Sequence, residues 1–239
     1  MLMPETWLLL QSGPGPADAN MAIDEALLES AAALGYPILR FYSWTEAAAT
    51  FGYSQAYAEV ARWTNLRPLI RRPTGGGLVP HDADWTYSLV FPPNHPWHSL
   101  KAVESYQRLH EWVRTAFEKL DLPTSLSACG QTGAPGQCFA GAEKFDLLAN
   151  GRKIAGAAQR RNRRGLLIQG SVQPSAVRAT RSDWESAMLK GPACLSEIAW
   201  TPFQLDARLQ ERVRELIEQK YGQPAYQERK SVGKFPHPN

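Results

Sequence analysis

The sequence is poor in cysteine, in long apolar runs and in net charge, and each shortage excludes a class of protein. Its three cysteines, Cys129, Cys138 and Cys194, are odd in number and unclustered, which argues against a disulfide scaffold and a zinc knuckle. No apolar run approaches the roughly 20 residues of a membrane-spanning helix, and the first residues lack a signal-peptide pattern. A net charge of +3 is far below that of a dedicated nucleic-acid binder. We therefore expect a soluble cytoplasmic protein that binds neither membrane nor nucleic acid.

The length and apolar content of the chain are sufficient for a sizeable core. Its 239 residues, 44% of them apolar, predict one large domain. The predicted strands and helices are mixed without strict alternation, which favours an α+β fold with a mainly antiparallel sheet flanked by helices. We expect this domain to occupy residues 1–229, with a polar tail over 230–239.

Local patterns predict the individual elements. Strands are expected over residues 7–10, 37–42, 48–52, 86–91, 145–149, 152–158 and 166–172. The first of these should end at the Gly-Pro-Gly-Pro run of residues 13–16. Helices are expected over residues 18–33, 105–120 and 205–221, and from about residue 183, while 125–141 should form a loop. The Asn150-Gly151 pair predicts a tight hairpin between two strands.

The most informative segment is a run of three glycines that follows two arginines, Arg71-Arg72-Pro73-Thr74-Gly75-Gly76-Gly77. Glycines add no apolar side chain to a core, so this run indicates a close approach of bare backbone to another group. The segment lacks the lysine of a P-loop and the spacing of a dinucleotide-binding fingerprint. A nest of backbone N–H groups for an anion is one interpretation, and a glycine-rich bend with solvated arginines is the other.

Four further features are candidates for chemistry. Lys153 lies in a strand of small residues, where it could face a pocket or simply be exposed. Cys138 lies in a glycine-rich loop that would leave a thiol accessible, although a loop cysteine is often incidental. His81 and Asp82 could act together as a general base, but the side chains of adjacent residues on an extended chain point to opposite faces. The basic run 160–164 is either a solvated hairpin tip or a docking site for an acidic partner.

Five short segments, taken in their order and spacing, form a specific pattern. They are Asn20-Met21-Ala22-Ile23-Asp24-Glu25, Leu39-Arg40-Phe41-Tyr42-Ser43-Trp44, Gly52-Tyr53-Ser54-Gln55, Arg71-Arg72-Pro73-Thr74-Gly75-Gly76-Gly77 with His81-Asp82, and Gly151-Arg152-Lys153-Ile154-Ala155-Gly156-Ala157-Ala158-Gln159. In this pattern the chain resembles the lipoate–protein ligase A and octanoyltransferase family of cofactor transferases, from about residue 7 to residue 174. The resemblance implies the fold of biotin and lipoate protein ligases.

The resemblance also implies a site that handles a lipoyl or octanoyl chain. The glycine loop would line a tunnel for the acyl chain, Lys153 matches the family lysine that contacts the acyl carbonyl, and Arg72 matches an arginine at the pocket rim. The expected substrate-binding residues are Arg72, Thr74, Gly75, Gly76, Gly77, Val79, His81, Gly156 and Ala157.

Two chemistries occur among the proteins that this chain resembles. Ligases join free lipoate to a protein lysine through an acyl-adenylate with ATP and magnesium, and need no cysteine. Octanoyltransferases of the Gram-positive type use a cysteine in a Cys-Phe pair before the hairpin, which Cys138-Phe139 matches. The chain departs from the transferase pattern at Gly77, where arginine is frequent, and at Gln169, where a histidine often precedes Gly-Ser.

On this basis we predict an octanoyltransferase with Cys138 and Lys153 as catalytic residues. The Cys138 thiolate would attack the thioester of octanoyl-acyl carrier protein, while Lys153 favours the thiolate and stabilises the oxyanion. A lysine of the lipoyl domains of 2-oxoacid dehydrogenases, or of glycine cleavage H protein, would then take the acyl group. We expect a monomer without cofactor or metal, and a basic face over residues 160–164 that suits acidic partners.

Three alternatives remain open at this point. One is an ATP-dependent lipoate–protein ligase that uses ATP and Mg²⁺ and works through lipoyl-adenylate. Another is an amidotransferase that moves octanoyl from H protein to a lipoyl domain. The third, from a different class, is a non-catalytic lipoyl- or biotin-binding homologue that kept only the fold.

Overall fold

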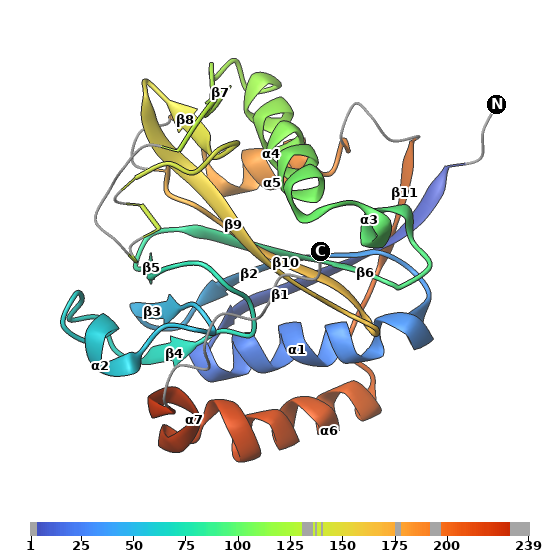
Figure 1. The fold of residues 1–239 in the computed structure, drawn as a ribbon. Helices are drawn as coiled ribbons and strands as arrows, with labels where there is room; N and C mark the ends of the chain where they lie inside the picture. The colour runs from blue at the N-terminus through green and yellow to red at the C-terminus, as the bar shows by residue number, and fades with distance from the viewer. Residues whose placement is uncertain are drawn as a thin grey trace.

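The computed structural model describes residues 4–130, 136, 138–139, 141–174, 178–191 and 197–229, and a mixed sheet forms its centre (Figure 1). The sheet has eight strands in the order β11-β1-β2-β6-β10-β9-β8-β7. Their bounds are β1 Glu5–Gly15, β2 Ile38–Trp44, β6 Trp85–Phe91, β7 Ser125–Leu126, β8 Leu147–Ala149, β9 Arg152–Asn162, β10 Gly165–Val172 and β11 Ile198–Pro202. Strand β1 is parallel to β2 and β11, and the other neighbours are antiparallel. The predicted α+β class with a mainly antiparallel sheet is confirmed.

A second, three-stranded sheet carries the glycine loop. It consists of β3 (Ala48–Phe51), β4 (Leu69–Arg71) and β5 (Val79–His81), in the order β4-β3-β5. The glycine run lies between β4 and β5, which pair with opposite edges of β3. The loop therefore has both of its ends fixed by the same strand.

Helices cover both faces of the large sheet (Figure 1). Helices α1 (Ala17–Leu34) and α6 (Ala207–Leu216) lie along one face, and α4 (Ala102–Glu118) and α5 (Arg181–Met188) lie along the other. The shorter elements are α2 (Tyr57–Val60), α3 (Pro96–Ser99), the π-helical turn η2 (Ile217–Tyr221) and α7 (Pro224–Glu228). Helix α4 buries Leu109, Trp112, Val113 and Phe117 against the sheet, at the three- and four-residue spacing of an amphipathic helix.

The structure corrects several of the predicted boundaries. Strand β1 continues to Gly15 because a bulge between Gln11 and Gly13 absorbs one residue, and β11 pairs only with residues 5–9, so Pro14 leaves no ladder bond unmade on that side. The start of the predicted loop 125–141 forms β7, which pairs with β8. The late helix ends in the π-helical turn η2, and β11 was not predicted.

The Asn150-Gly151 hairpin between β8 and β9 is confirmed. Both residues have positive φ, 50° and 75°, which is the backbone of a type I′ turn. The predicted tail, residues 230–239, and Cys194 lie outside the described residues. Within the described ranges, no helix has the length and apolar character needed to cross a membrane.

Candidate active site

The glycine loop brings backbone against backbone next to the small sheet. A Cβ added to Gly52 would collide with the Gly76 carbonyl group, and one added to Gly77 would collide with the carbonyl group of Gly136. Gly76 itself has φ +82°, in the left-handed region that favours glycine. Gly76 and Gly77 are therefore needed for the path and close packing of the loop, as the sequence indicated, whereas a Cβ on Gly75 would meet nothing within 4 Å.

A pocket lies between the glycine loop, β9, β10 and α1. It encloses about 460 Å³ of empty space, including the part open to solvent. Its walls are formed by Met21, Tyr42, Trp44, Thr50, Arg72, Val79, His81, Thr86, Cys138, Phe139, Lys153, Gly156, Ala157, Ala158, Gln169, Gly170 and Ser171. Seven predicted site residues are in this wall, namely Arg72, Val79, His81, Cys138, Lys153, Gly156 and Ala157.

The other four predicted residues lie behind the wall as the structure describes it. Thr74 is buried, and its hydroxyl donates a hydrogen bond of 2.7 Å to the Gln169 side chain, which does line the pocket. The carbonyl of Gly75 accepts from the Arg72 guanidinium, and Gly77 donates its N–H to the Cys138 sulfur. Thr74, Gly75 and Gly77 thus hold the lining side chains Gln169, Arg72 and Cys138 by hydrogen bonds.

The Cys138 thiol lies at the pocket, held by the backbone that follows the glycine loop. Its Sγ accepts a hydrogen bond of 3.0 Å from the Gly77 N–H. Two backbone hydrogen bonds with Leu78 fix the segment, from Leu78 N to Gly136 O at 2.7 Å and from Cys138 N to Leu78 O at 3.1 Å. The sulfur is therefore held at the pocket wall by a backbone donor and by a segment that is itself fixed.

Arg72 adds a positive charge beside this sulfur. The guanidinium is buried and donates to the Gly75 carbonyl and, at 3.4 Å, to the Thr50 hydroxyl. Burial lowers the pKa of Arg72, while its charge interaction and hydrogen bond with Cys138 act in the opposite direction. Arg72 and the Gly77 N–H are thus the groups that meet the sulfur directly.

Lys153 also reaches Cys138, but at the carbonyl oxygen. Its Nζ donates to Cys138 O at 2.6 Å, lies 2.7 Å from Asp146 Oδ2 and sits 5.0 Å above the Phe139 ring. Gly156 makes room for the lysine, since a Cβ there would lie 2.8 Å from Lys153 Cε. The structure brings the two predicted catalytic residues together and directs the lysine to the peptide group of the cysteine.

Asp146 holds Lys153 in place, and sequence reasoning missed it. The carboxylate is fully buried and accepts hydrogen bonds from the Tyr106 hydroxyl and, at 2.6 Å, from the Glu143 N–H. Burial and the nearby Asp146 charge raise the pKa of Tyr106 well above its usual range, so it stays a donor. The available signal was a lone carboxylate in an otherwise apolar run.

His81 is paired with Asp84 and not with its neighbour Asp82, which is exposed. Its Nδ1 lies 2.8 Å from Asp84 Oδ2, its Nε2 lies 2.9 Å from the Thr50 hydroxyl, and its ring stacks on Trp44 at 3.9 Å. Because Thr50 also contacts Arg72, this pair is connected to the cation at the thiol. The predicted separation of residues 81 and 82 is confirmed, and Asp84 was missed.

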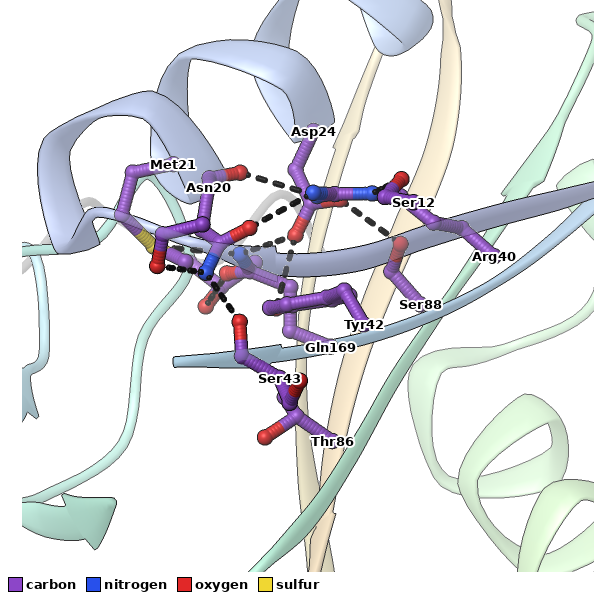
Figure 2. Close-up of polar contacts among 12 residues, drawn as sticks. Ser12, Asn20, Met21, Asp24, Arg40, Tyr42, Ser43, Thr86, Ser88 and Gln169 are labelled. Carbon is purple, nitrogen blue, oxygen red and sulfur yellow. Dashed lines mark hydrogen bonds and ion pairs between the residues drawn. The ribbon is translucent and has the colours of Figure 1, made fainter. Parts of the chain in front are cut away.

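A buried polar network shares Met21, Tyr42 and Gln169 with the pocket wall (Figure 2). Asp24 of α1 accepts hydrogen bonds from Arg40 and Ser88, each at 2.7 Å, and from Tyr42 at 3.1 Å. Gln169 joins the network to the pocket wall, since its amide donates to Asp24 Oδ2 at 2.7 Å and lies 3.4 Å from the Met21 sulfur. This part of the pocket wall is therefore supported by hydrogen bonds from α1, β2, β6 and β10.

The basic run 160–164 is largely engaged with the protein itself. Arg161 turns inward and donates to the carbonyls of Trp97 and His98. Arg164 lies 2.9 Å from Glu29, and Arg160 lies 3.7 Å from a Glu25 oxygen. The free basic face expected at this hairpin is therefore smaller than the sequence suggested. Of the other cysteines, Cys129 is exposed.

With the geometry described, comparisons with known proteins define the class. Residues 16–176 match the family model of the lipoyl protein ligase A/B catalytic domain. The chain therefore belongs to this family. It is similar in structure to a putative lipoate protein ligase from T. acidophilum solved with bound lipoic acid, with a TM-score of 0.75, 22% identity, and coverage of 94% of this chain and 98% of the other. That likeness confirms the fold.

Closer relatives in sequence are octanoyltransferases. The chain is 34% identical over 174 residues to the octanoyltransferase LipM of Carboxydothermus hydrogenoformans. This aligned region covers 70% of this chain and 65% of that protein. It is 32% identical over 184 residues to the octanoyltransferase LipM of Bacillus subtilis, which covers 72% of this chain and 66% of that protein. The chain thus matches about two thirds of the length of these relatives.

Proposed function

We propose that this protein is an acyltransferase that moves an octanoyl group from octanoyl-acyl carrier protein, through a Cys138 thioester, to a lysine of a lipoyl domain or of glycine cleavage H protein. The observation that carries the proposal is the Cys138 sulfur in the pocket wall, with the Gly77 N–H at 3.0 Å and the Arg72 guanidinium beside it. The LipM relatives, which are named octanoyltransferases, support the same reaction.

In the first half-reaction, the Cys138 thiolate attacks the carbonyl carbon of the donor thioester. A new C–S bond to Cys138 forms, the old C–S bond breaks, and the carrier leaves as a thiolate that takes up a proton. Arg72 and the Gly77 N–H favour the attacking thiolate, and Lys153, fixed by Asp146, is the cation that faces the developing oxyanion. The pocket between β9, β10 and the glycine loop holds the octanoyl chain.

In the second half-reaction, the amine of the acceptor lysine attacks the acyl-Cys138 thioester. An amide bond forms, the bond to Cys138 Sγ breaks, and the amine nitrogen loses a proton while the thiolate is regenerated. Conversion of a thioester to an amide is favourable, so we propose that the cycle needs neither ATP nor Mg²⁺. The largely apolar side chains and small residues of the pocket wall, such as Val79, Phe139 and Ala157, suit a saturated acyl chain.

The test is to incubate the protein with octanoyl-acyl carrier protein and to follow intact mass. We expect one hydroxylamine-labile octanoyl adduct at Cys138, its absence in Cys138→Ala, and its retention in Cys129→Ala, which removes an exposed cysteine instead. Full activity of Cys138→Ala with lipoate and ATP would show a ligase and overturn the proposal. A protein that forms neither the adduct nor an acyl-adenylate would be a binding homologue.

A further inference from the structure

A second polar site lies beside the glycine loop, and the pocket chemistry does not use it. It is formed by the cations Arg160, Lys220 and Arg229 around the rings of Tyr53 and Tyr226, and we call it the cationic cradle. The Arg229 guanidinium carbon lies 3.9 Å from the Tyr53 ring centroid and 4.7 Å from that of Tyr226. The two other cations also contact these rings. The Arg160 guanidinium carbon lies 5.7 Å from the Tyr53 ring centroid, and Lys220 Nζ lies 5.0 Å from the Tyr226 ring centroid.

Positive charge exceeds negative charge in this cradle. Glu25 is the carboxylate that contacts it, at 2.5 Å from Lys220 Nζ and 3.7 Å from Arg160 Nη1. Among the described residues, one carboxylate against three cations leaves a local excess of two positive charges. A fourth cation, Arg71, donates hydrogen bonds to backbone carbonyls of α7 and of Arg229. Burial is the main cause that lowers the pKa of Arg71, and the charge of Arg229 lowers it further. The cradle is therefore crowded with like charge.

Several donors in the cradle are buried without an acceptor. Within the part of the chain that the structure describes, Arg160 Nη1 and the Nε and Nη2 atoms of Arg229 have almost no solvent exposure and no hydrogen-bond partner. The Arg160 distance to Glu25, 3.7 Å, is too long for a hydrogen bond. The two guanidinium groups have other contacts, since Arg229 Nη1 donates to the Tyr53 hydroxyl at 3.1 Å and the Arg160 side chain is 34% exposed. Buried donors that lack acceptors are still unfavourable and rare in folded proteins, and unpaired N–H donors on cations fit an anion.

The cradle lies on the same side of the glycine loop as the reactive thiol. Ala158 lines the pocket, and Arg160, two residues further along β9, projects from the same face of the strand. A Cβ placed on Gly76 would lie 3.6 Å from both Cys138 Sγ and Ala158 Cβ, so the thiol and this stretch of β9 are close neighbours. Tyr53 is tied to the same loop by a hydrogen bond of 2.9 Å from its N–H to Thr74 O.

We propose that the cationic cradle binds the phosphate group on the arm of the acyl donor. Two guanidinium forks and an ammonium match the oxygens of a phosphate ester, and the flanking aromatic rings hold the guanidinium planes in place. This inference rests on the proposed function, because an acyl carrier protein presents its thioester at the end of a phosphopantetheine arm. The pantetheine chain separates the thioester from the phosphate, so the phosphate of an arm that reaches the thiol lies outside the acyl pocket.

Two of the three cradle cations lie outside the region that matches the family model. Lys220 and Arg229 belong to η2 and to the residue after α7, beyond residue 176 where the family match ends. The C-terminal helices would therefore contribute to donor recognition, with the shared catalytic region supplying Arg160 from β9.

The experiment compares two small donors that differ by one phosphate, octanoyl-pantetheine and octanoyl-4′-phosphopantetheine. Acylation of Cys138 is followed by mass in the full chain, in Arg229→Gln, in Arg160→Gln and in Arg163→Gln, an exposed arginine of the same hairpin that serves as control. We expect the unmodified protein to favour the phosphorylated donor in kcat/KM by at least about tenfold, the factor that one charge-assisted hydrogen bond supplies. The cradle variants should lose that preference and keep their rate with octanoyl-pantetheine, whereas Arg163→Gln should keep both.

Equal use of the two donors by the unmodified protein would overturn the cradle proposal. So would cradle variants that weaken transfer from the whole carrier protein but not from octanoyl-4′-phosphopantetheine, because the cations would then recognise acidic side chains. Calorimetric binding of 4′-phosphopantetheine against pantetheine separates this inference from the proposed function. If neither donor acylates Cys138 but phosphate-dependent binding is present and is lost in Arg229→Gln, the proposed function fails and the anion site stands.

Discussion

Two buried ion pairs of the same chemical kind lie on opposite faces of the large sheet. Asp24 and Arg40, between α1 and β2, are 2.7 Å apart and fully buried. Asp146 and Lys153, where β8 and β9 meet α4, are also 2.7 Å apart, and only the lysine retains 6% exposure. Distance and burial alone would assign them the same role.

The difference lies in what the remaining hydrogen bonds of each pair contact. The Arg40 guanidinium donates to Ser12 and Asn20, and Asp24 accepts from residues of β2, β6 and β10, so this pair joins fixed groups of the scaffold (Figure 2). Lys153 instead donates to the carbonyl of Cys138, at the wall of the pocket. The group to which a buried ion pair is further hydrogen-bonded therefore indicates whether the pair supports the scaffold or the site.

The largest expected effect of a substitution is at the scaffold pair. Arg40→Met leaves Asp24 buried without its counter-charge, and we expect the free energy of unfolding to fall by about 3–5 kcal/mol. Urea unfolding followed by circular dichroism measures it. The double variant Arg40→Met/Asp24→Leu removes both charges and should recover part of the loss. A single variant within about 1 kcal/mol of the unmodified protein would show that the pair contributes little.

Local sequence patterns predicted the fold where the structure is decided locally. The apolar spacing of α4, the Asn150-Gly151 turn and the strong strand β6 all appear in the expected places. Strand β11 exists because it pairs with residues 5–9, close to the other end of the sequence, and β1 extends to Gly15 because its second half pairs with β2. Such pairing depends on tertiary contacts, so no local pattern announces it.

The site was predicted in the same uneven way. Resemblance to a family placed Cys138 and Lys153 in one site, and the structure brings them together. The carboxylates that orient the site, Asp146 and Asp84, were missed because each pairs with groups that no local pattern links to it. The solvated arginines that one interpretation of the glycine run expected are not found at Arg71, whose buried guanidinium donates to backbone carbonyls of the C-terminal segment.

At the Asp146–Lys153 pair we expect a smaller loss of stability than for Arg40→Met, together with a loss of activity. Lys153→Met removes the cation, but Asp146 keeps its hydrogen bonds from Tyr106 and the Glu143 N–H. We therefore expect the free energy of unfolding to fall by only about 1–3 kcal/mol. The rate of Cys138 acylation in single-turnover mass assays should fall about 100-fold, as for loss of one oxyanion donor. Lys144→Met, at an exposed lysine nearby, is the matched control and should change neither quantity. Unchanged acylation in Lys153→Met would remove this pair from the chemistry.

A third prediction concerns His110 of α4, which lies next to Tyr106 and is influenced by both members of the second pair. Burial lowers the pKa of His110 to about 4, although its Nδ1–H donates to the Tyr106 carbonyl at 3.0 Å and the Asp146 charge opposes the shift. The folded protein therefore keeps this histidine neutral over a pH range in which the unfolded chain binds a proton. Because the unfolded state binds more protons, the free energy of unfolding falls as the pH decreases from about 6.5 to 4, by about 1 kcal/mol per pH unit.

The measurement is urea unfolding at several pH values within that window, on the unmodified protein and on His110→Asn. Other titrating groups contribute to both proteins, so the difference between the two curves isolates the histidine. The stability of the unmodified protein should fall more steeply toward pH 4 than that of the variant, by the slope of one proton. Parallel curves would mean that His110 can be protonated in the folded state. The polar groups beneath α4 would then accommodate a second cation beside Lys153, which the saturated network around Asp24 and Arg40 could not do.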